Sequence, residues 1–407
     1  MNIVVINHYA GGPDFGMEFR HYYLATEWVK AGHKVLIVAS SFSHLRSRQP
    51  RVNAERIDGV EYVWLKTNTY TGNGPGRIFN MFLFIFKLYT SLGKKLKIFR
   101  PDLIIASSTY PLDNLPASFF AKKNKAKLCY EVKDVWPLSP RELGGYSKNH
   151  PFIRIMQYAE NFAYQHAHYV VSTLPKTMEH MISHGMKPEK FCYIPNGISL
   201  RDWQIRPTTH EHQHFLRHLK TNEKIIVGYL GGHAISNALD TLLEVAVLAQ
   251  SAKTDFAFVL IGDGSEKARL MEKAKDLAIT NLHFLPPVSK SNVPAVLSEM
   301  DILYIGWKKN PLYRFGISPN KLMDYMMAAK PIVHSVCAAN DFVADSSCGI
   351  SVQPDDPAVV FEALVKIINL SEEERVQMGI RGKNFVMKNH NYAVLAQKFI
   401  DFCTPRL

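Results

Sequence analysis

The sequence is poor in cysteine, with five in 407 residues. The count is odd, and none of the five shows the close spacing of a metal-binding pair. These features exclude a disulfide framework and indicate the reduced thiols of a cytosolic protein. The five are Cys129, Cys192, Cys337, Cys348 and Cys403.

Long apolar runs are also lacking. The stretch MFLFIF (81–86) is too short to span a bilayer. The opening MNIVVINHY (1–9) has neither a basic region nor a small-residue cleavage site, so we expect a buried strand there rather than a signal peptide. The apolar content of 47% is that of an ordinary globular protein, and 407 residues suffice for two or three domains.

Several ligand-binding patterns are absent. Neither half contains GxGxxG followed by a strand-end acidic residue, which excludes a typical dehydrogenase. No zinc-finger spacing or RNP-like aromatic motif supports nucleic-acid binding. Asp355 and Asp356 are adjacent, as in some metal-binding motifs, but we expect them in an exposed PDDP turn. The net charge of +12 instead indicates anionic partners, such as phosphate-bearing substrates or an acidic membrane surface.

Short apolar runs alternate with helical patterns, which predicts an α/β protein with parallel sheets. A polar, histidine-rich segment at 199–223 separates two such series. No acidic or cysteine partner gives its histidines a defined ligand set, so we interpret it as a solvated linker and helix rather than a metal site. We therefore expect two successive sheets with a cleft between them. The predicted strands are 2–7, 33–40, 60–66, 102–107, 127–132, 169–173, 191–195, 224–231, 255–264, 281–288, 301–307 and 330–336.

Glycine-rich turns follow several predicted strands. Gly11 and Gly12 follow the first strand, where they either permit a tight turn or let a substrate approach the backbone. In the second half, the segments 231–232, 262–264 and 287–288 follow successive strands. Because the carboxyl ends of parallel strands meet at one edge, we expect these three turns to line a ligand-binding edge.

The stretch YRFGISPNKLMDYMMAAKP (313–331) predicts an anion site. Ser318 is the expected N-cap and Pro319 the first helical residue. Free N–H groups and the positive end of the helix dipole would then lie beside Lys321, an arrangement suited to phosphate. Asp324, one turn further on, is placed to accept hydrogen bonds from sugar hydroxyls. The alternative is an ordinary capped helix whose lysine faces solvent.

The stretch RIFNMFLFIFKLYTSLGKKLKIF (77–99) has a different character. A basic helix rich in phenylalanine is typical of segments that lie in the headgroup plane of an anionic membrane. The alternative is a helix packed on the sheet with its lysines in solvent. The sequence leaves both open.

Taken together, these segments resemble the glycosyltransferases of GT-B type, and specifically the large retaining family four. Within that family they are most similar to the bacterial O-antigen and capsule transferases of the fucosamine type. The resemblance runs from about residue 1 to 400. The segments that carry it are HYAGGPDFG (8–16), EVKDVWP (131–137), IPNGI (194–198), GDG (262–264), FLPPV (284–288) and SPNKLMDYMMAAKPIV (318–333).

The resemblance implies two Rossmann-like domains that face a deep interdomain cleft. An acceptor-binding domain would span 1–198, and a nucleotide-sugar-binding domain would span 199–387. The last helix, at about 388–407, would pack back on the first domain.

The resemblance also places the donor site. The family has two acidic residues separated by seven positions, the second of which holds the donor's ribose. Asp324 matches the second, whereas the first falls on Gly316, so we expect backbone amides of this loop to replace a carboxylate. The basic residues that usually follow the Gly-Gly loop are missing here, and Lys321 is the best substitute, ahead of Arg314 and His233. The expected donor set is Gly231, Gly232, Gly262, Asp263, Val288, Arg314, Gly316, Ile317, Ser318, Asn320, Lys321 and Asp324.

The implied activity is metal-independent, retaining transfer of a hexosyl or N-acetylhexosaminyl group from a UDP-sugar, without a cofactor. Lys321 would stabilise the departing diphosphate. Asp134, with Glu131 behind it, is the candidate for accepting the acceptor's proton, although a turn or N-cap role for Asp134 stays open. Gly11 and Gly12 would lie on the acceptor side.

The implied acceptor is a saccharide linked to polyprenyl diphosphate, in lipopolysaccharide, O-antigen or capsule biosynthesis. The enzyme would be cytoplasmic and peripheral to the anionic inner membrane surface, with no nucleic-acid partner. A nucleotide-sugar epimerase of the same fold and a non-catalytic sugar-nucleotide binder are the alternatives.

Overall fold

A computed structural model describes the chain except for residues 17–18, 73, 205–210, 223 and 405–407. The chain divides into two compact units. The first comprises Met1–Asn196 and the chain from Tyr392 on, and the second comprises Gly197–Asn391.

Within the described residues, the first unit contains an eight-stranded sheet of order β3-β4-β2-β1-β5-β6-β7-β8. All neighbouring strands are parallel except β3, which pairs antiparallel with β4. The apolar runs become central strands because helices bury both of their faces. The strands are β1 (Asn2–Ile6), β2 (Lys34–Ser40), β3 (Ala54–Ile57), β4 (Val60–Leu65), β5 (Leu103–Ala106), β6 (Lys127–Val132), β7 (Tyr169–Ser172) and β8 (Phe191–Tyr193).

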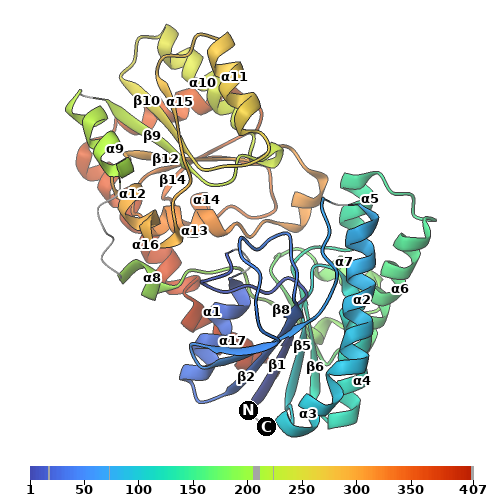
Figure 1. The fold of residues 1–407 in the computed structure, drawn as a ribbon. Helices are drawn as coiled ribbons and strands as arrows, with labels where there is room; N and C mark the ends of the chain where they lie inside the picture. Colours follow the sequence, from blue (N-terminus) through green and yellow to red (C-terminus); the bar gives the residue numbers. More distant parts are fainter. Residues whose placement is uncertain (17–18, 73, 205–210, 223, 405–407) are drawn as a thin grey trace. The chain divides into compact units, whose positions relative to one another are not determined.

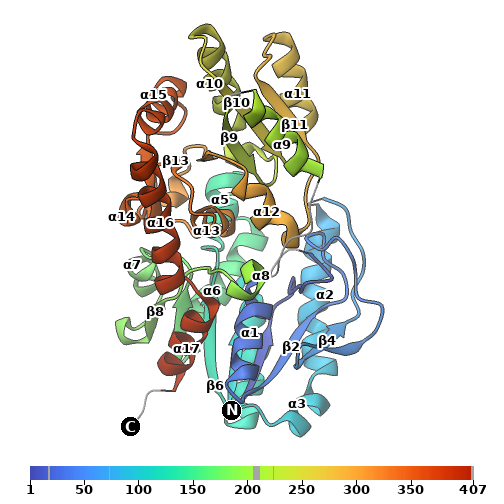
Figure 2. The same ribbon diagram turned by 90° about the vertical axis from the view of Figure 1, so that its left-hand side faces the viewer.

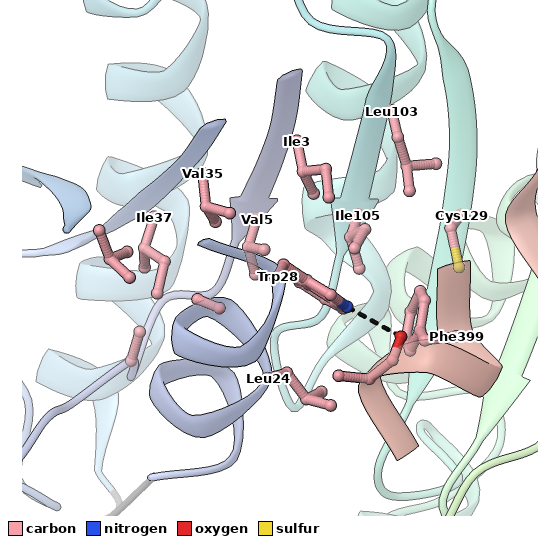
Figure 3. Close-up of a cluster of buried hydrophobic side chains, with 14 of the residues drawn as sticks. Ile3, Val5, Leu24, Trp28, Val35, Ile37, Leu103, Ile105, Cys129 and Phe399 are labelled. Carbon is pink, nitrogen blue, oxygen red and sulfur yellow. Dashed lines mark hydrogen bonds between the residues drawn. The ribbon is translucent and has the colours of Figure 1, made fainter. Parts of the chain in front are cut away.

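Helices cover both faces of this sheet (Figure 1). One face carries α1 (Arg20–Lys30) and α17 (Tyr392–Cys403), which pack together around Trp28 and Phe399. The Trp28 indole donates a 3.0 Å hydrogen bond to the carbonyl of Ala396, as Figure 3 shows. The other face carries α2 (Pro75–Ser91), α3 (Gly93–Phe99), α4 (Asn114–Asn124) and α6 (Pro151–His166). The remaining helices of this unit are η1 (Pro111–Asp113), α5 (Leu138–Gly144), α7 (Met178–Ser183) and η2 (Pro188–Lys190).

The described part of the second unit contains a parallel six-stranded sheet of order β11-β10-β9-β12-β13-β14. Its strands are β9 (Ile225–Leu230), β10 (Phe256–Ile261), β11 (Leu282–Leu285), β12 (Ile302–Gly306), β13 (Ile332–Ser335) and β14 (Gly349–Val352).

Two apolar clusters cover the two faces of this second sheet, and Figure 2 displays the helices that form them. One includes α10 (Leu239–Ser251), α11 (Lys267–Asp276) and α15 (Pro357–Ile368). The other includes α9 (Glu211–Thr221), α12 (Val293–Ser298), α13 (Asn320–Met327), α14 (Phe342–Ser346) and α16 (Glu372–Asn389). The shorter elements of this unit are α8 (Leu200–Gln204), η3 (Ile235–Asn237), η4 (Lys290–Asn292) and η5 (Pro311–Phe315).

Two local predictions need correction. The stretch 77–99 forms two helices, α2 and α3, which meet at Leu92. The histidine-rich segment 199–223 is not wholly solvated, since His212 of α9 is buried and its Nε2 lies 2.9 Å from the carbonyl oxygen of Pro286. His210 lies outside the described residues.

Candidate donor and acceptor sites

Three turns lie at one edge of the second sheet. Strand β10 pairs in parallel with β9 on one side and with β11 on the other. The turns that follow these strands, 231–232, 262–264 and 287–288, therefore share the carboxyl edge, as the sequence predicts. In doubly wound sheets this edge binds ligands.

The first two turns touch each other closely enough to require glycine. Gly262 has a φ of +150°, and a Cβ there would lie 1.9 Å from the carbonyl oxygen of Gly231. A Cβ on Gly264 would lie 2.3 Å from the carbonyl oxygen of His233. Both contacts are with backbone, which cannot move aside as a side chain can. Asp263, between the two glycines, has an exposed side chain, and its carbonyl accepts a 2.8 Å hydrogen bond from the amide of His233.

Lys321 reaches this pair of turns from α13. Its ammonium donates to the hydroxyl of Tyr229 at 2.8 Å and to Oδ1 of Asn237 at 2.7 Å. The same hydroxyl and the amide of Asn237 donate to the carbonyl of Gly232 at 2.6 and 2.8 Å. A Cβ on Gly231 would lie 3.2 Å from Nζ of Lys321, so the loop backbone and the ammonium are direct neighbours. The structure thus brings Gly231, Gly232, Gly262 and Lys321 together.

Burial sets the charge state of this lysine. Desolvation lowers the pKa of Lys321 from 10.5 to about 7. No carboxylate in the described part of the chain forms an ion pair with its ammonium, and its partners are the neutral oxygens of Tyr229 and Asn237. An anion placed beside a partly desolvated cation with neutral partners stabilises the charged form, which is otherwise penalised.

Two further basic groups border the same turns. Lys267, at the start of α11, donates from Nζ to the carbonyls of Gly262 and Leu285 at 2.7 and 3.1 Å. His233 is fully buried, and burial, with a smaller contribution from the charge of Lys267, lowers its pKa to about 4. His233 is therefore neutral at pH 7, which corrects its ranking as a phosphate-binding charge. Sequence reasoning missed Lys267, although a lysine five residues beyond Gly262 is a readable signal.

The start of α13 differs by one residue from the prediction. The helix begins at Asn320, which is exposed, and Pro319 is its N-cap in an extended conformation. Ser318 therefore lies one residue before the N-cap, and the prediction that Ser318 is the N-cap and Pro319 the first helical residue is wrong.

Two backbone N–H groups of the loop before α13 already have hydrogen-bond partners. Gly316 donates to the carbonyl of Tyr313 at 2.9 Å, and Ile317 donates to Oδ1 of Asn340 at 2.7 Å. These two amides are therefore engaged, and the expectation that they replace the missing carboxylate is wrong. Ser318, the third residue of that expectation, is half-buried. Arg314 lies on the exposed side of η5, where its guanidinium stacks 4.6 Å from the ring centre of Phe315 and donates to the carbonyl of Pro311.

Asp324, the candidate for the ribose, is buried and already paired. Lys290 of η4 donates to its two carboxylate oxygens at 2.6 and 2.5 Å, and the indole of Trp203 lies 3.3 Å from Oδ1. Sequence reasoning missed both partners. Lys290 is two residues beyond Val288, which packs half-buried against the cluster around α13. A ribose at Asp324 would therefore meet Lys290 as well.

The acceptor-side candidates lie at the carboxyl edge of the first sheet. Gly11 and Gly12 follow β1 in a buried turn, and Tyr62 donates a 3.1 Å hydrogen bond to the carbonyl of Gly11. Asp134 follows β6 and its side chain is exposed. The carboxylate of Asp134 is therefore exposed enough for another molecule to reach it.

Glu131 has a different setting from Asp134. It is fully buried in β6, where Arg20, His21 and Ser107 hydrogen-bond to its carboxylate. Burial alone raises its pKa, but the charges of Arg20 and His21 outweigh this and hold the pKa well below its usual range. A carboxylate with no exposed surface cannot touch an acceptor, so the structure does not support the catalytic assignment of Glu131.

Comparisons with known proteins give the family. Residues 15–197 match the family model described as a glycosyl transferase 4-like domain, and residues 224–369 match glycosyl transferases group 1. The chain is a GT-B glycosyltransferase.

The relatives of this GT-B glycosyltransferase agree with that membership. The chain is 26% identical over 218 residues to WcaI of Escherichia coli (strain K12), named as a colanic acid biosynthesis glycosyl transferase. That match spans 52% of each protein, so it covers about half the length of the curated relative.

Solved structures share the fold over nearly the whole chain. The sucrose-phosphate synthase of Thermosynechococcus elongatus has a TM-score of 0.73 at 15% identity, over 98% of this chain and 97% of its own. HepE of Anabaena, solved in complex with UDP-glucose, has a TM-score of 0.66 at 13% identity, over 98% of both chains.

The family matches divide the candidate residues of this GT-B glycosyltransferase. The donor candidates from Gly231 to Asp324 all lie in the group 1 match. Glu131 and Asp134 lie in the 4-like match, whereas Gly11 and Gly12 precede it. Among the helices that the structure describes, none has the length and apolar character needed to span a membrane.

Proposed function

We propose that this glycosyltransferase transfers a hexosyl or N-acetylhexosaminyl group from a UDP-sugar, with retention, to a saccharide linked to polyprenyl diphosphate. The reaction would contribute to a bacterial surface polysaccharide such as O-antigen, capsule or colanic acid. The observation that carries the proposal is the half-buried ammonium of Lys321, whose hydrogen-bond partners are neutral and which lies against the Gly231-Gly232 turn.

The donor diphosphate is the anion that fits this position. Lys321 would meet a phosphate oxygen, and the closely packed glycine turns would let the diphosphate approach the backbone. Asp324, with Lys290 beside it, would hold the ribose hydroxyls, and Val288 would lie next to the nucleobase. That UDP is the nucleotide is supported by the UDP-glucose bound to HepE, a protein of the same fold.

The reaction breaks the bond between the anomeric carbon and the diphosphate oxygen, and that oxygen keeps the electron pair. The acceptor hydroxyl oxygen forms the new bond on the same face of the sugar. Its proton passes to the departing phosphate or to Asp134. Charge develops on the diphosphate in the transition state, so a cation fixed beside it lowers the barrier. No step of this scheme requires a metal ion.

A lipid-linked acceptor places the enzyme at the cytoplasmic face of the inner membrane. Helix α2 supports this location, since Phe79, Phe82, Phe86 and Tyr89 are exposed on it. Lysines flank these aromatic residues at Lys87, Lys94 and Lys97. Aromatic side chains beside lysines suit an interface with anionic lipid.

The test compares the wild-type protein with Lys321→Met, which keeps the length and apolar stem of the side chain. Each is incubated with a panel of UDP-sugars and a polyprenyl-diphosphate-linked saccharide, with and without EDTA, and products are identified by mass spectrometry. We expect one UDP-sugar to extend the acceptor equally well in EDTA. The variant should lose at least 100-fold in kcat/KM, because removing one transition-state donor costs about 10²–10³ in rate.

Two outcomes would contradict the proposal. Conversion of the UDP-sugar to an epimer without acceptor would indicate an epimerase. Unchanged turnover in a folded Lys321→Met variant, with Lys366→Met of α15 as the exposed cationic control, would remove Lys321 from the donor site.

A further inference from the structure

A second group of ligand-type side chains lies in the first unit, on helices that the donor chemistry does not use. Glu160 is on α6, whereas His180 is on α7 and His184 directly follows that helix. One ligand atom of each residue lies within 4.8 Å of the others. None of the sequence patterns predicts this group, because Glu160 is twenty residues from His180.

The carboxylate of this group is fixed by its neighbours. Glu160 is fully buried, and within the described chain its ion pair is with His180 rather than with a lysine or an arginine. The hydroxyl of Tyr164 donates to Oε1 at 3.1 Å, and the amide of Gln157 donates to Oε2 at 2.7 Å. Metal-binding carboxylates are held in this way by outer hydrogen bonds, which orient the remaining lone pairs.

The two histidines have the spacing and orientation of a metal-binding pair. Residues four apart on a helix share one face, and the two imidazole centres are 4.3 Å apart. Nδ1 of His184 lies 2.8 Å from the carbonyl oxygen of His180, which can only accept, so Nδ1 carries the proton. In the neutral imidazole this tautomer leaves the lone pair on Nε2, the atom that a metal ion would bind.

The distances suit a small tetrahedral ion. Nε2 of His180 lies 3.1 Å from Oε1 of Glu160. Two ligands on one tetrahedral Zn²⁺, each about 2.0–2.1 Å from the ion, are about 3.3 Å apart. Only the second histidine needs to move closer, and its side chain is half-buried and lies at the end of a short helix.

We propose that Glu160, His180 and His184 bind a divalent transition-metal ion of the Zn²⁺ class, with water as the fourth ligand. Two imidazoles and one carboxylate favour Zn²⁺ over Mg²⁺ or Ca²⁺, which prefer oxygen ligands. Binding displaces the hydrogen bond between Nε2 of His180 and Oε1 of Glu160, so that both atoms can face the ion. The ion connects α7 to α6 and takes no part in the transfer reaction.

An ordinary ion pair between Glu160 and His180 would explain the buried carboxylate without a metal. It gives no role to His184, however. The contribution of His184 to metal affinity therefore separates the two explanations.

The experiment uses the full chain without an affinity tag, stripped with EDTA and dialysed. Isothermal titration calorimetry with ZnCl₂ and with MgCl₂ measures stoichiometry and affinity, and the absorbance of the Co²⁺ form reports tetrahedral geometry. The variants are His184→Ala, which leaves the buried pair intact, and Glu160→Gln, which keeps the shape of the carboxylate. His166→Ala is the control, because His166 is an exposed histidine of the same α6 outside the cluster.

We expect one equivalent of Zn²⁺ per chain, bound at least 100-fold more tightly than Mg²⁺, and a higher melting temperature with Zn²⁺. His184→Ala and Glu160→Gln should each weaken Zn²⁺ binding at least tenfold, whereas His166→Ala should bind as the wild type does. Absence of stoichiometric binding, or equal affinity in a folded His184→Ala variant, would overturn the proposal.

Discussion

At the scale of single residues, Lys321 determines how the donor edge responds to pH. Burial disfavours its charged form, and the oxygens of Tyr229 and Asn237 compensate for only part of the lost hydration. The residue is thus able to gain or lose a proton near pH 7, unlike an exposed lysine. An anion that binds beside it favours the protonated form and raises its pKa.

This behaviour predicts pH-dependent donor binding. The pKa of Lys321 is about 7 in the ligand-free protein, so the residue is mostly charged below pH 7 and mostly neutral above it. Above pH 7, UDP binding must take up one proton, and the affinity should fall by up to tenfold per pH unit. The second ionisation of a phosphate, near pH 6, is complete in this range. Calorimetry in buffers of different ionisation enthalpy measures the proton uptake directly.

The matched variant for this prediction is Lys321→Met. It should bind UDP more weakly and without proton uptake, so its affinity should not change between pH 7 and 9. Equal wild-type affinity at pH 7 and 9 would show that Lys321 does not contact the phosphate.

Residue-level predictions from the sequence succeeded where local patterns decide contacts. Gly231 and Gly262 follow adjacent parallel strands, so their meeting is a consequence of topology. The hydrogen bond from the amide of Ile317 to Asn340 could not be predicted, because Asn340 lies twenty-three positions away and no sequence pattern connects the two residues. The pairing of Asp324 with Lys290 was hidden for the same reason.

At the scale of elements, α2 has one buried face and one exposed aromatic face. One face holds Phe84 and Leu88, which are buried against the sheet, and Met81, which is buried in a neighbouring cluster. The exposed face holds Phe79 and Phe86, which are 60% and 59% exposed. Composition alone could not choose between packing and membrane contact, because this helix has enough aromatic residues for both.

The exposed face of α2 predicts membrane binding that depends on its aromatic residues. Full burial of a phenylalanine contributes about 1.5–3 kcal/mol. The double substitution Phe79→Ser, Phe86→Ser should therefore weaken partitioning onto vesicles of phosphatidylglycerol and phosphatidylethanolamine at least tenfold. Sedimentation with such vesicles, at low and at high salt, measures this. Wild-type binding should also weaken as salt screens the lysines.

Met271→Ser is the matched control, since Met271 is an apolar side chain of α11 in the second unit and is 49% exposed. It should bind vesicles as the wild type does. Equal partitioning of the α2 double variant and the wild type would remove α2 from the membrane contact.

At the scale of the whole molecule, the order of most strands and helices can be predicted from the sequence, since most strands are apolar runs between amphipathic helices. The short edge strands β3 and β14 were not predicted. Strand β3 alternates exposed and half-buried residues, and no residue of β14 is fully buried, so both lack a continuous apolar run. By contrast, Ser371 and Glu374 form a capping box at the start of α16, a local pattern of two residues three positions apart.

The first unit includes α17, which follows the whole second unit in the sequence. We therefore expect the stability of the first unit to depend on the packing of α17. Helix α17 packs Phe399, which is fully buried, against the indole of Trp28, with ring centres 5.4 Å apart. Phe399→Ala leaves a cavity between α17 and α1 and should reduce the free energy of unfolding of this unit by about 3–5 kcal/mol. That is a large part of the 5–15 kcal/mol typical of a domain. Urea unfolding followed by tryptophan fluorescence measures the loss, because Trp28 lines the cavity.

Val394→Ala supplies the comparison on the same helix. Val394 belongs to α17 and is 44% exposed. Truncation at an exposed position should change the free energy of unfolding by no more than about 0.5 kcal/mol. If both substitutions were equally mild, α17 would contribute little to the core of the first unit. A loss confined to Phe399→Ala would show that the last helix is part of the fold that supports the acceptor side.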